Sequence, residues 1–181
     1  MGREELTPRS WKELLEGVRE EIGEGNIKGF GLTRRLEIPS KTGTGKLWLG
    51  GAPFDEDGLV TSTCFTFCAR KRFPTDVRLG RHAEPIFRSK GWALLKTGDD
   101  SFDSEFGVWT SSLEKAGSLI SGPVQRSLRR LADLHPEIRM YINRKEVTLE
   151  LPGLVFKQAQ LIAFVLKSVG CVHHLLGKVQ S

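Results

Sequence analysis

Residues 138–151 read IRMYINRKEVTLEL, and this stretch decides the fold class. In both halves apolar residues alternate with polar ones, which is the pattern of a β-strand that buries one face. The apolar positions are Ile138, Met140, Ile142, Val147, Leu149 and Leu151. The polar segment 143–145 between the halves is short enough for a tight turn, so the two strands should pair antiparallel. The sequence therefore predicts a β-hairpin over 138–151 with one apolar face.

Helices are expected on both sides of this hairpin. Pro123 stands where the first residue of a helix would be, and the helical spacing of apolar residues ends before His135-Pro136, so a helix is predicted over 123–134. A closing helix is predicted over 157–176, because its apolar residues are numerous enough to bury one face against a sheet. With a further short strand at 106–110, the C-terminal order is β-α-β-β-α.

The chain begins with another amphipathic helix. Thr7 is a suitable N-cap and Pro8 a suitable first residue, and apolar residues recur at helical spacing from Trp11 to Ile22. Gly23 should end this helix, since glycine interrupts helical segments. The sequence therefore predicts a helix over 8–22.

Several segments in the middle of the chain are typical of strands. Alternation over 27–38 predicts a β region, residues 39–45 have the composition of a loop, and a short strand could follow at 46–49. The run 59–69 is rich in β-branched and aromatic residues and places Phe65 and Phe67 on one face. Shorter strands are predicted near 76–79 and 92–96.

These patterns predict an α+β fold in which helices lie on one face of a largely antiparallel sheet. A chain of 181 residues with 39% hydrophobic residues fits one globular domain over 1–181, with a subdivision near residue 90 as the alternative. The longest uninterrupted apolar run, 161–166, is far shorter than the roughly 20 residues of a membrane span, so none is expected. The first residues lack a signal sequence, and we expect a cytoplasmic protein.

The cysteines do not form a metal site or a disulfide framework. Cys64 and Cys68 share one face of a predicted strand, but the strand rise separates them by about 13 Å, too far for one zinc ion. Cys171, His173 and His174 lie in the closing helix without a second ligand pair at zinc-finger spacing. We therefore expect no metal and no cofactor.

Two motifs resemble ligand-binding loops but fit structural roles better. The segment Gly43-Thr44-Gly45-Lys46 departs from a phosphate-binding loop, because Ser40 and Leu47 stand where that loop needs a glycine and a serine or threonine.

The acidic run 99–105 could in principle bind a cation or supply paired carboxylates. Its spacing fits better a capped turn that Phe102 and Phe106 anchor in the core. No catalytic residue is assigned.

Positive charge is concentrated after the first helix. Residues 26–181 hold 23 Lys and Arg against 15 Asp and Glu, within a net charge of +5 for the chain. The candidate phosphate-binding residues are Arg70, Lys71, Arg72, Arg126, Arg129 and Arg130. Because no recognition helix or aromatic reading motif accompanies them, we expect nucleic-acid binding to be weak and independent of sequence.

From about residue 72 to residue 176 the order of features resembles a group of uncharacterised bacterial domains related in pattern to the DUF3137 family. The resemblance rests on Phe73-Pro74, on the motif TGDxxFDxxF that begins at Thr97, on a helix ending Leu128-x-x-Leu131, and on the hairpin and the closing helix. Members of such families often lie beside transmembrane segments. The resemblance implies a fold and supplies no catalytic residue.

The sequence favours a non-catalytic binding or scaffolding domain that engages a protein partner. A basic domain that binds nucleic acid or phospholipid headgroups is the alternative, and an enzyme that uses the acidic run 99–105 is the third candidate. A homodimer through the apolar closing helix is also compatible with the sequence, since an exposed apolar helix face needs a partner to cover it.

Overall fold

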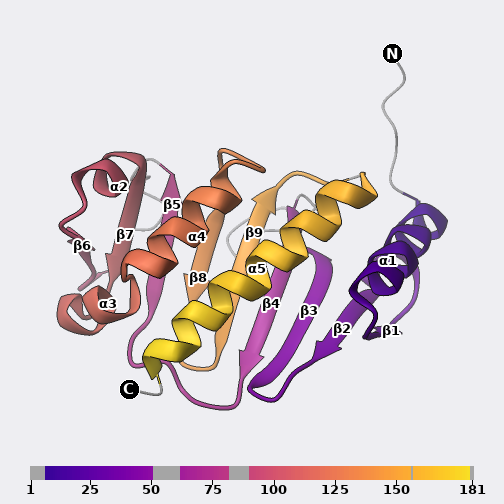
Figure 1. The fold of residues 1–181 in the computed structure, drawn as a ribbon, viewed down its shortest axis with the longest axis horizontal. Coiled ribbons are helices and arrows are strands. Elements are labelled where there is room, and N and C mark those ends of the chain that lie inside the picture. Colours follow the sequence, from indigo (N-terminus) through magenta and orange to yellow (C-terminus); the bar gives the residue numbers. More distant parts are fainter. Residues whose placement is uncertain (1–6, 51–61, 82–89, 156, 180–181) are drawn as a thin grey trace.

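A computed structural model describes residues 7–50, 62–81, 90–155 and 157–179 of the chain. In this part of the chain nine strands form one open sheet in which every neighbouring pair is antiparallel (Figure 1). The strand order across the sheet is β1-β2-β3-β4-β9-β8-β5-β7-β6. The strands are β1 (Asn26–Lys28), β2 (Arg35–Pro39), β3 (Gly43–Gly50), β4 (Ser62–Ala69), β5 (Val77–Arg81), β6 (Ala93–Leu95), β7 (Phe106–Thr110), β8 (Arg139–Ile142) and β9 (Glu146–Pro152).

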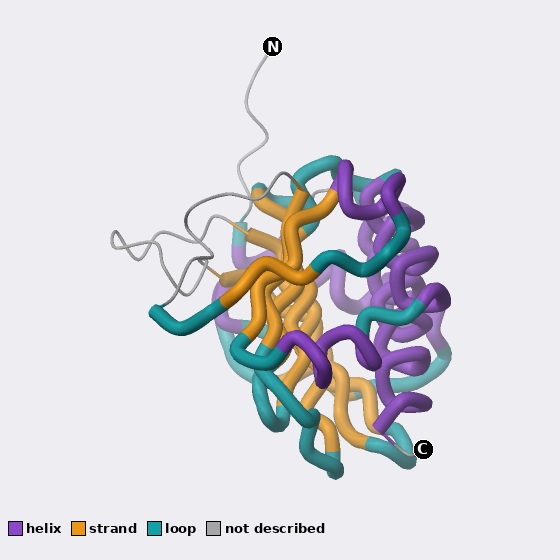
Figure 2. The backbone as a smooth tube through the Cα atoms, turned by 90° about the vertical axis from the view of Figure 1, so that its left-hand side faces the viewer, coloured by secondary structure: helices purple, strands orange, loops and turns teal. Residues whose placement is uncertain are grey.

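The main helices lie on one face of this sheet. The helix α5 crosses the middle strands, with α4 on one side of it and α1 on the other (Figure 1). Figure 2 shows the sheet from its edge, with the long helices standing on one side of the strands. The predicted α+β class with a largely antiparallel sheet is confirmed. The helices are α1 (Pro8–Ile22), α2 (Asp100–Glu105), α3 (Leu113–Leu119), α4 (Gly122–Ala132) and α5 (Gln158–Val179).

One row of paired apolar residues crosses all nine strands on the helical face. Each member lies directly opposite the next across a strand pair, and all except Ile27 are buried. The buried side chains of the helices belong to the same core cluster as this row, so the helices pack on it. From β1 to β6 the row consists of Ile27, Leu36, Leu47, Phe65, Leu149, Met140, Leu79, Val108 and Leu95.

The predicted loop over 39–45 is wrong at both ends, because Pro39 is the last residue of β2 and β3 begins at Gly43. The physical reason is the space that glycine leaves. A Cβ atom on Gly43 would collide with the backbone oxygen of Cys68, and one on Gly45 would stand 2.7 Å from the ring of Phe65. The glycines therefore let β3 pair closely with β4, although the composition of segment 39–45 is typical of a loop.

The predicted C-terminal order β-α-β-β-α lacks one helix, because α3 precedes α4 between β7 and β8. Only Ala116 and Leu119 of α3 are buried, and Gly117 lies in its interior. A helix this short carries about two turns of apolar spacing, too few to stand out in the sequence.

The other predicted elements are present with small shifts. The β region 27–38 consists of β1 and β2 with a 3-10 turn, Gly31–Thr33, between them. The strand predicted over 59–69 is β4, and its residues 59–61 lie outside the described residues. The hairpin 138–151 is β8 and β9, paired from Ile142 with Val147 to Arg139 with Glu150.

The closing helix α5 is both apolar in composition and partly buried in the fold. By length and composition α5 is apolar enough to cross a membrane, since Lys167 and Lys178 are its only charged residues. The sequence-based prediction of no membrane span considered only the uninterrupted apolar run 161–166 and so missed this property. In the fold 44% of its most apolar window is buried. Core helices of soluble proteins share this composition, so it does not by itself assign α5 to a bilayer. The buried residues of α5 are Leu161, Phe164, Val165, Ser168, Cys171, Val172, Leu175 and Leu176.

Candidate functional site

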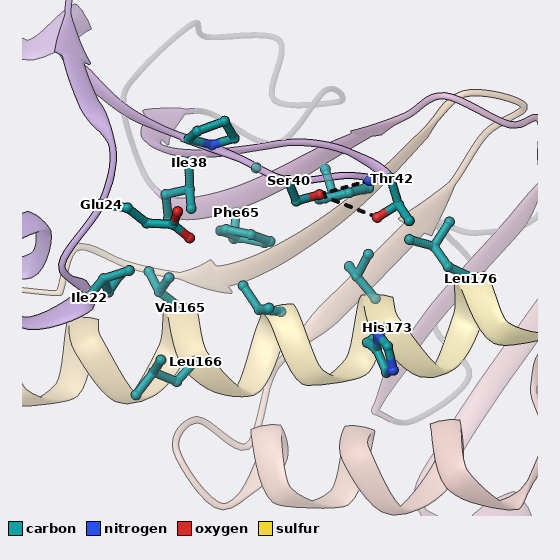
Figure 3. A pocket seen from close by; sticks show the side chains of 15 residues that line it. Ile22, Glu24, Ile38, Ser40, Thr42, Phe65, Val165, Leu166, His173 and Leu176 are labelled. Atoms are coloured by element: carbon teal, nitrogen blue, oxygen red, sulfur yellow. Dashed lines mark hydrogen bonds between the residues drawn. The ribbon is translucent and has the colours of Figure 1, made fainter.

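A groove lies on the helical face between α5 and the strands β2 to β4. It has a volume of about 260 Å³. Ile38 and Phe65 form its floor on the sheet side, and Val165 lies along its α5 wall (Figure 3). Phe67 of β4 and Val169 of α5 also line it. We call this site the apolar groove. Its other lining residues are Ile22, Glu24, Pro39, Ser40, Thr42, Gly45, Leu166, Val172, His173 and Leu176.

The C-terminal end of α1 borders the groove. Ser10 N donates to Thr7 Oγ1 (3.1 Å) at the start of α1, as the predicted N-cap requires. At the other end Gly23 takes a left-handed conformation (φ 78°) and its N–H donates to the carbonyl of Arg19, which closes the helix at Ile22. Ile22 and Glu24, at this end of α1, therefore line the groove beside Ile38.

The outer edge of the groove exposes apolar side chains. Leu166 is 56% exposed and Val169 is 44% exposed, although both belong to the helix that otherwise packs into the core. Both residues line the groove, so its lining includes apolar side chains that are exposed to solvent. A surface of this kind is typical of a binding site.

Polar groups stand at both ends of the groove. At one end is Glu24, just after α1, and at the other is the turn with Ser40 and Thr42 (Figure 3). Thr42 N donates to Ser40 Oγ at 3.3 Å, and Ser40 Oγ donates to the carbonyl oxygen of Gly43 at 3.2 Å. These bonds hold the turn in place beside His173 and Leu176 of α5.

A second, smaller pocket of about 200 Å³ continues the groove at this turn. It shares Thr42 and Leu176 with the groove and is also lined by Lys41, Arg70 and Lys71. The apolar groove therefore has a carboxylate at one end and three cationic side chains at the other.

The structure divides the six predicted basic residues between two regions. Arg70 and Lys71 line the second pocket, and the adjacent Arg72 lines an open depression with the turn of the β8–β9 hairpin. The other three lie on α4, on the helical face (Figure 1).

Of these three, Arg129 has a structural role. Its Nη2 atom lies 3.2 Å from Asp99 Oδ1 and its Nε atom 3.6 Å from Glu105 Oε1, and its guanidinium lies over the ring of Phe102. Arg126 and Arg130 are exposed on α4. The sequence could not show this division, because it depends on where α4 and the loop after β4 lie in space.

The acidic run 99–105 has structural roles in the fold. Asp99 caps α2 by accepting from Phe102 N (3.0 Å), and Asp103 accepts from the N–H and the hydroxyl of Thr97. Phe102 and Phe106 are buried and their rings stack at 4.8 Å, so the prediction that both are core anchors is confirmed. The hydrogen bond from Phe102 N and the nearby Arg129 hold the pKa of Asp99 below its ordinary range.

A buried polar cluster lies on the opposite face of the sheet. Glu150 of β9 is 1% exposed, and its Oε1 atom accepts a hydrogen bond of 2.5 Å from Ser62 Oγ. It stands opposite both Cys64 and Arg139 in the strand register. Burial, and then the charge of Glu150, raise the pKa of Cys64 to about 12, and the same two causes raise the pKa of Tyr141. The thiol and the phenol are therefore protonated at neutral pH and are poor nucleophiles.

The sequence did not indicate this cluster, because alternation predicts that the polar face of a hairpin meets water. Cys171 is buried in α5, which raises its pKa to about 12. His174 Nδ1 lies 2.9 Å from Ser127 Oγ. Across the described residues no three His, Cys, Asp or Glu side chains come close enough together to hold a metal ion.

Comparisons with known proteins identify a shared fold. No known family model matches the sequence, and no functionally described protein matches it. The structure is similar to the crystal structure of the mycobacterial trehalose monomycolate transport factor A, TtfA, with a TM-score of 0.58 over 90% of this chain and 82% of that one. The identity is 14%, so the similarity shows the fold alone. The resemblance to DUF3137 domains stays a prediction.

The apolar groove is thus the site with the clearest capacity to bind another molecule. Residues of β2 to β4 form its floor, residues of α5 form its wall, and two of its apolar lining residues are exposed to solvent. Asp99, Asp103 and Arg129 have structural roles, and the thiols of Cys64 and Cys171 are protonated at neutral pH.

Proposed function

We propose that this chain is a non-catalytic binding domain that engages a protein partner through the apolar groove. The observation that carries the proposal is the mainly apolar lining of the groove together with Leu166 and Val169, which line it and are exposed to solvent. Burying such a surface against a partner is favourable by roughly 25 cal/mol for each Å² of apolar area.

The partner that fits is an amphipathic helix. A dry apolar cavity of about 150 Å³ holds a benzene molecule, so a groove of about 260 Å³ has room for about two large apolar side chains. Side chains at i and i+3 or i+4 of a helix project on the same side and would enter together. A basic residue near Glu24 and an acidic residue near Lys41 would complement the two ends of the groove.

Two further observations agree with a binding role. The pKa values of Cys64 and Cys171 are raised, which disfavours thiolate chemistry. The structural neighbour is named for transport of a molecule rather than for a reaction.

The test is selection of helical peptides from a displayed library against the purified chain. We expect the selected peptides to share two apolar residues three or four positions apart, with an acidic residue toward one end. Val169→Glu should abolish their binding, because it places a charge in the apolar surface. Leu113→Glu is the matched control, since Leu113 is a similarly exposed apolar residue on another helix.

Equal binding to both variants would overturn the proposal, as would selected peptides without a common apolar pair. Light scattering of the free protein provides a separate outcome. A dimer that becomes a monomer in Val169→Glu would identify a second copy of the chain as the occupant of the groove and would contradict a separate partner.

A further inference from the structure

Three segments meet at one end of the sheet and are tied together by backbone hydrogen bonds. They are the β2–β3 turn (40–42), the loop after β4 (70–76) and the β8–β9 turn (143–145), all at the lower end in Figure 1. Arg70 N donates to the carbonyl of Thr42 (2.9 Å), Ala69 N to that of Lys145 (2.8 Å) and Phe73 N to that of Arg144 (2.9 Å). We call these three segments the basic end.

The basic end carries six exposed cationic side chains and one acidic one. The acidic residue is Asp76, which is half-buried. None of the six cations forms an ion pair with another residue in the described part of the chain. The cations are Lys41, Arg70, Lys71, Arg72, Arg144 and Lys145.

The shape of the basic end fits a flat surface. The strands from β2 to β8 are four steps apart in the sheet, so the three segments extend over about 19 Å at the usual spacing between strands. The depression that contains Arg72, Arg144 and Lys145 is wide and shallow, and its lining also includes Asp76, Asn143 and Glu146. Apolar Leu176 and Val179 lie beside Lys41, Arg70 and Lys71, so cationic and apolar side chains occur together.

We propose that the basic end binds the surface of an anionic lipid bilayer. Clusters of four to eight Lys and Arg are the usual recognition element for anionic headgroups. Single-stranded nucleic acid fits less well, because its binding sites use exposed aromatic rings for stacking, and Phe73, the aromatic residue of these segments, is 2% exposed.

The strength of binding to an anionic membrane depends on the number of cations that face it. Each Lys or Arg near an anionic membrane strengthens binding by about fivefold. The attraction acts within about one Debye length, about 8 Å at physiological salt, so only cations that face the surface contribute. The binding should therefore depend strongly on these six residues and weaken as salt is raised.

The experiment uses the full chain and co-sedimentation with two kinds of vesicle. One is phosphatidylcholine alone, and the other mixes phosphatidylcholine with phosphatidylglycerol in equal parts. The triple variant Arg72→Glu, Arg144→Glu, Lys145→Glu should lose at least about 100-fold in binding to the mixed vesicles.

The matched control is Lys115→Glu, Arg126→Glu, Arg130→Glu, which changes the net charge equally at exposed residues of α3 and α4. It should stay within about fivefold of the wild type, because these residues lie away from the bound surface. Unchanged melting temperatures would show that both triple variants are folded.

Three results would overturn this inference. The first is that the basic-end variant binds the mixed vesicles as tightly as the wild type does. The second is that both triple variants lose vesicle binding to the same extent. The third is tight binding of a single-stranded oligonucleotide at physiological salt, lost in the basic-end variant, without vesicle binding. The proposed function is tested separately, since Val169→Glu should lose peptide binding and keep vesicle binding.

Discussion

The Cζ atom of Phe65 lies 2.7 Å from the position that a Cβ atom would take on Gly45. The ring therefore occupies space that glycine leaves free on the neighbouring strand. Phe65 and Gly45 both line the apolar groove, so this close contact between β3 and β4 lies at the site. The close pairing of the two strands therefore depends on the missing side chain.

We expect Gly43→Ala to destabilise the protein by about 1–3 kcal/mol, the usual cost of forcing extra atoms into a packed site. The new Cβ would meet the backbone oxygen of Cys68, which has little freedom to move. Urea denaturation measures the change. Gly170→Ala is the control, because nothing lies within 4 Å of that position in α5, and it should stabilise by up to about 1 kcal/mol. Equal shifts in both variants would contradict the steric explanation.

Phe164→Ala should cost about 3–5 kcal/mol, since the ring is fully buried in the core under α5. Leu166→Ala, two residues away on the same helix and 56% exposed, should change stability by less than about 1 kcal/mol. The two free energies of unfolding, measured by denaturant titration, would show whether α5 packs as described. Similar costs for both variants would indicate a different rotation of the helix.

Truncation at Gly153 should unfold the chain, because it removes the helix that covers the middle of the sheet (Figure 1). Burial of each large aliphatic side chain contributes roughly 1.5–3 kcal/mol, so the loss of several exceeds the stability of an ordinary domain. Circular dichroism would detect the unfolding. If the truncated chain stayed folded and only changed its oligomeric state, α5 would be an association element instead.

The contribution of Asp99 to stability should depend on pH. The pKa of Asp99 is lower in the folded state than in the unfolded state. The ionised Asp99 therefore stabilises the folded protein at pH values above the ordinary carboxyl range, and this stabilisation is lost as the pH falls through the folded-state pKa. The difference in unfolding free energy between wild type and Asp99→Asn should therefore be larger at neutral pH than at about pH 3. A difference that stays constant over this range would show that the cap and the pairing with Arg129 do not depend on the charge.

The thiols should react slowly with a disulfide reagent in the folded protein. Burial raises the pKa of Cys64 and of Cys171 to about 12, so almost no thiolate is present at pH 8. Cys68 is half-buried, and burial followed by its hydrogen bond to Glu146 raises its pKa, so it should be modified first but more slowly than a free cysteine. Mass spectrometry after timed labelling gives the order. Rapid modification of Cys64 would show that its surroundings open in solution.

Elements with a long, regular apolar pattern could be predicted from sequence. The helix α1, the hairpin β8–β9 and the helix α5 were found within a few residues, because the pattern depends only on neighbours along the chain. The capping of α1 by Thr7 and the anchoring of the acidic turn by Phe102 and Phe106 are equally local. Where the local signal is weak the prediction was wrong, as for α3 with Gly117 in its interior and for the start of β3 at Gly43.

The groove and the basic end were decided by tertiary structure. Arg70 and Leu176 line one pocket although more than half of the chain separates them. Periodicity identifies which residues of α5 are apolar, but the groove beside Val169 is formed by residues from α5, from the end of α1 and from β2 to β4 together. The burial of Glu150 likewise depends on what covers its face of the sheet. Sequence by itself determined the α+β class and the faces of the main elements, because these follow from local geometry. The sites depend on which distant segments come together, and that is set by the packing of the whole chain.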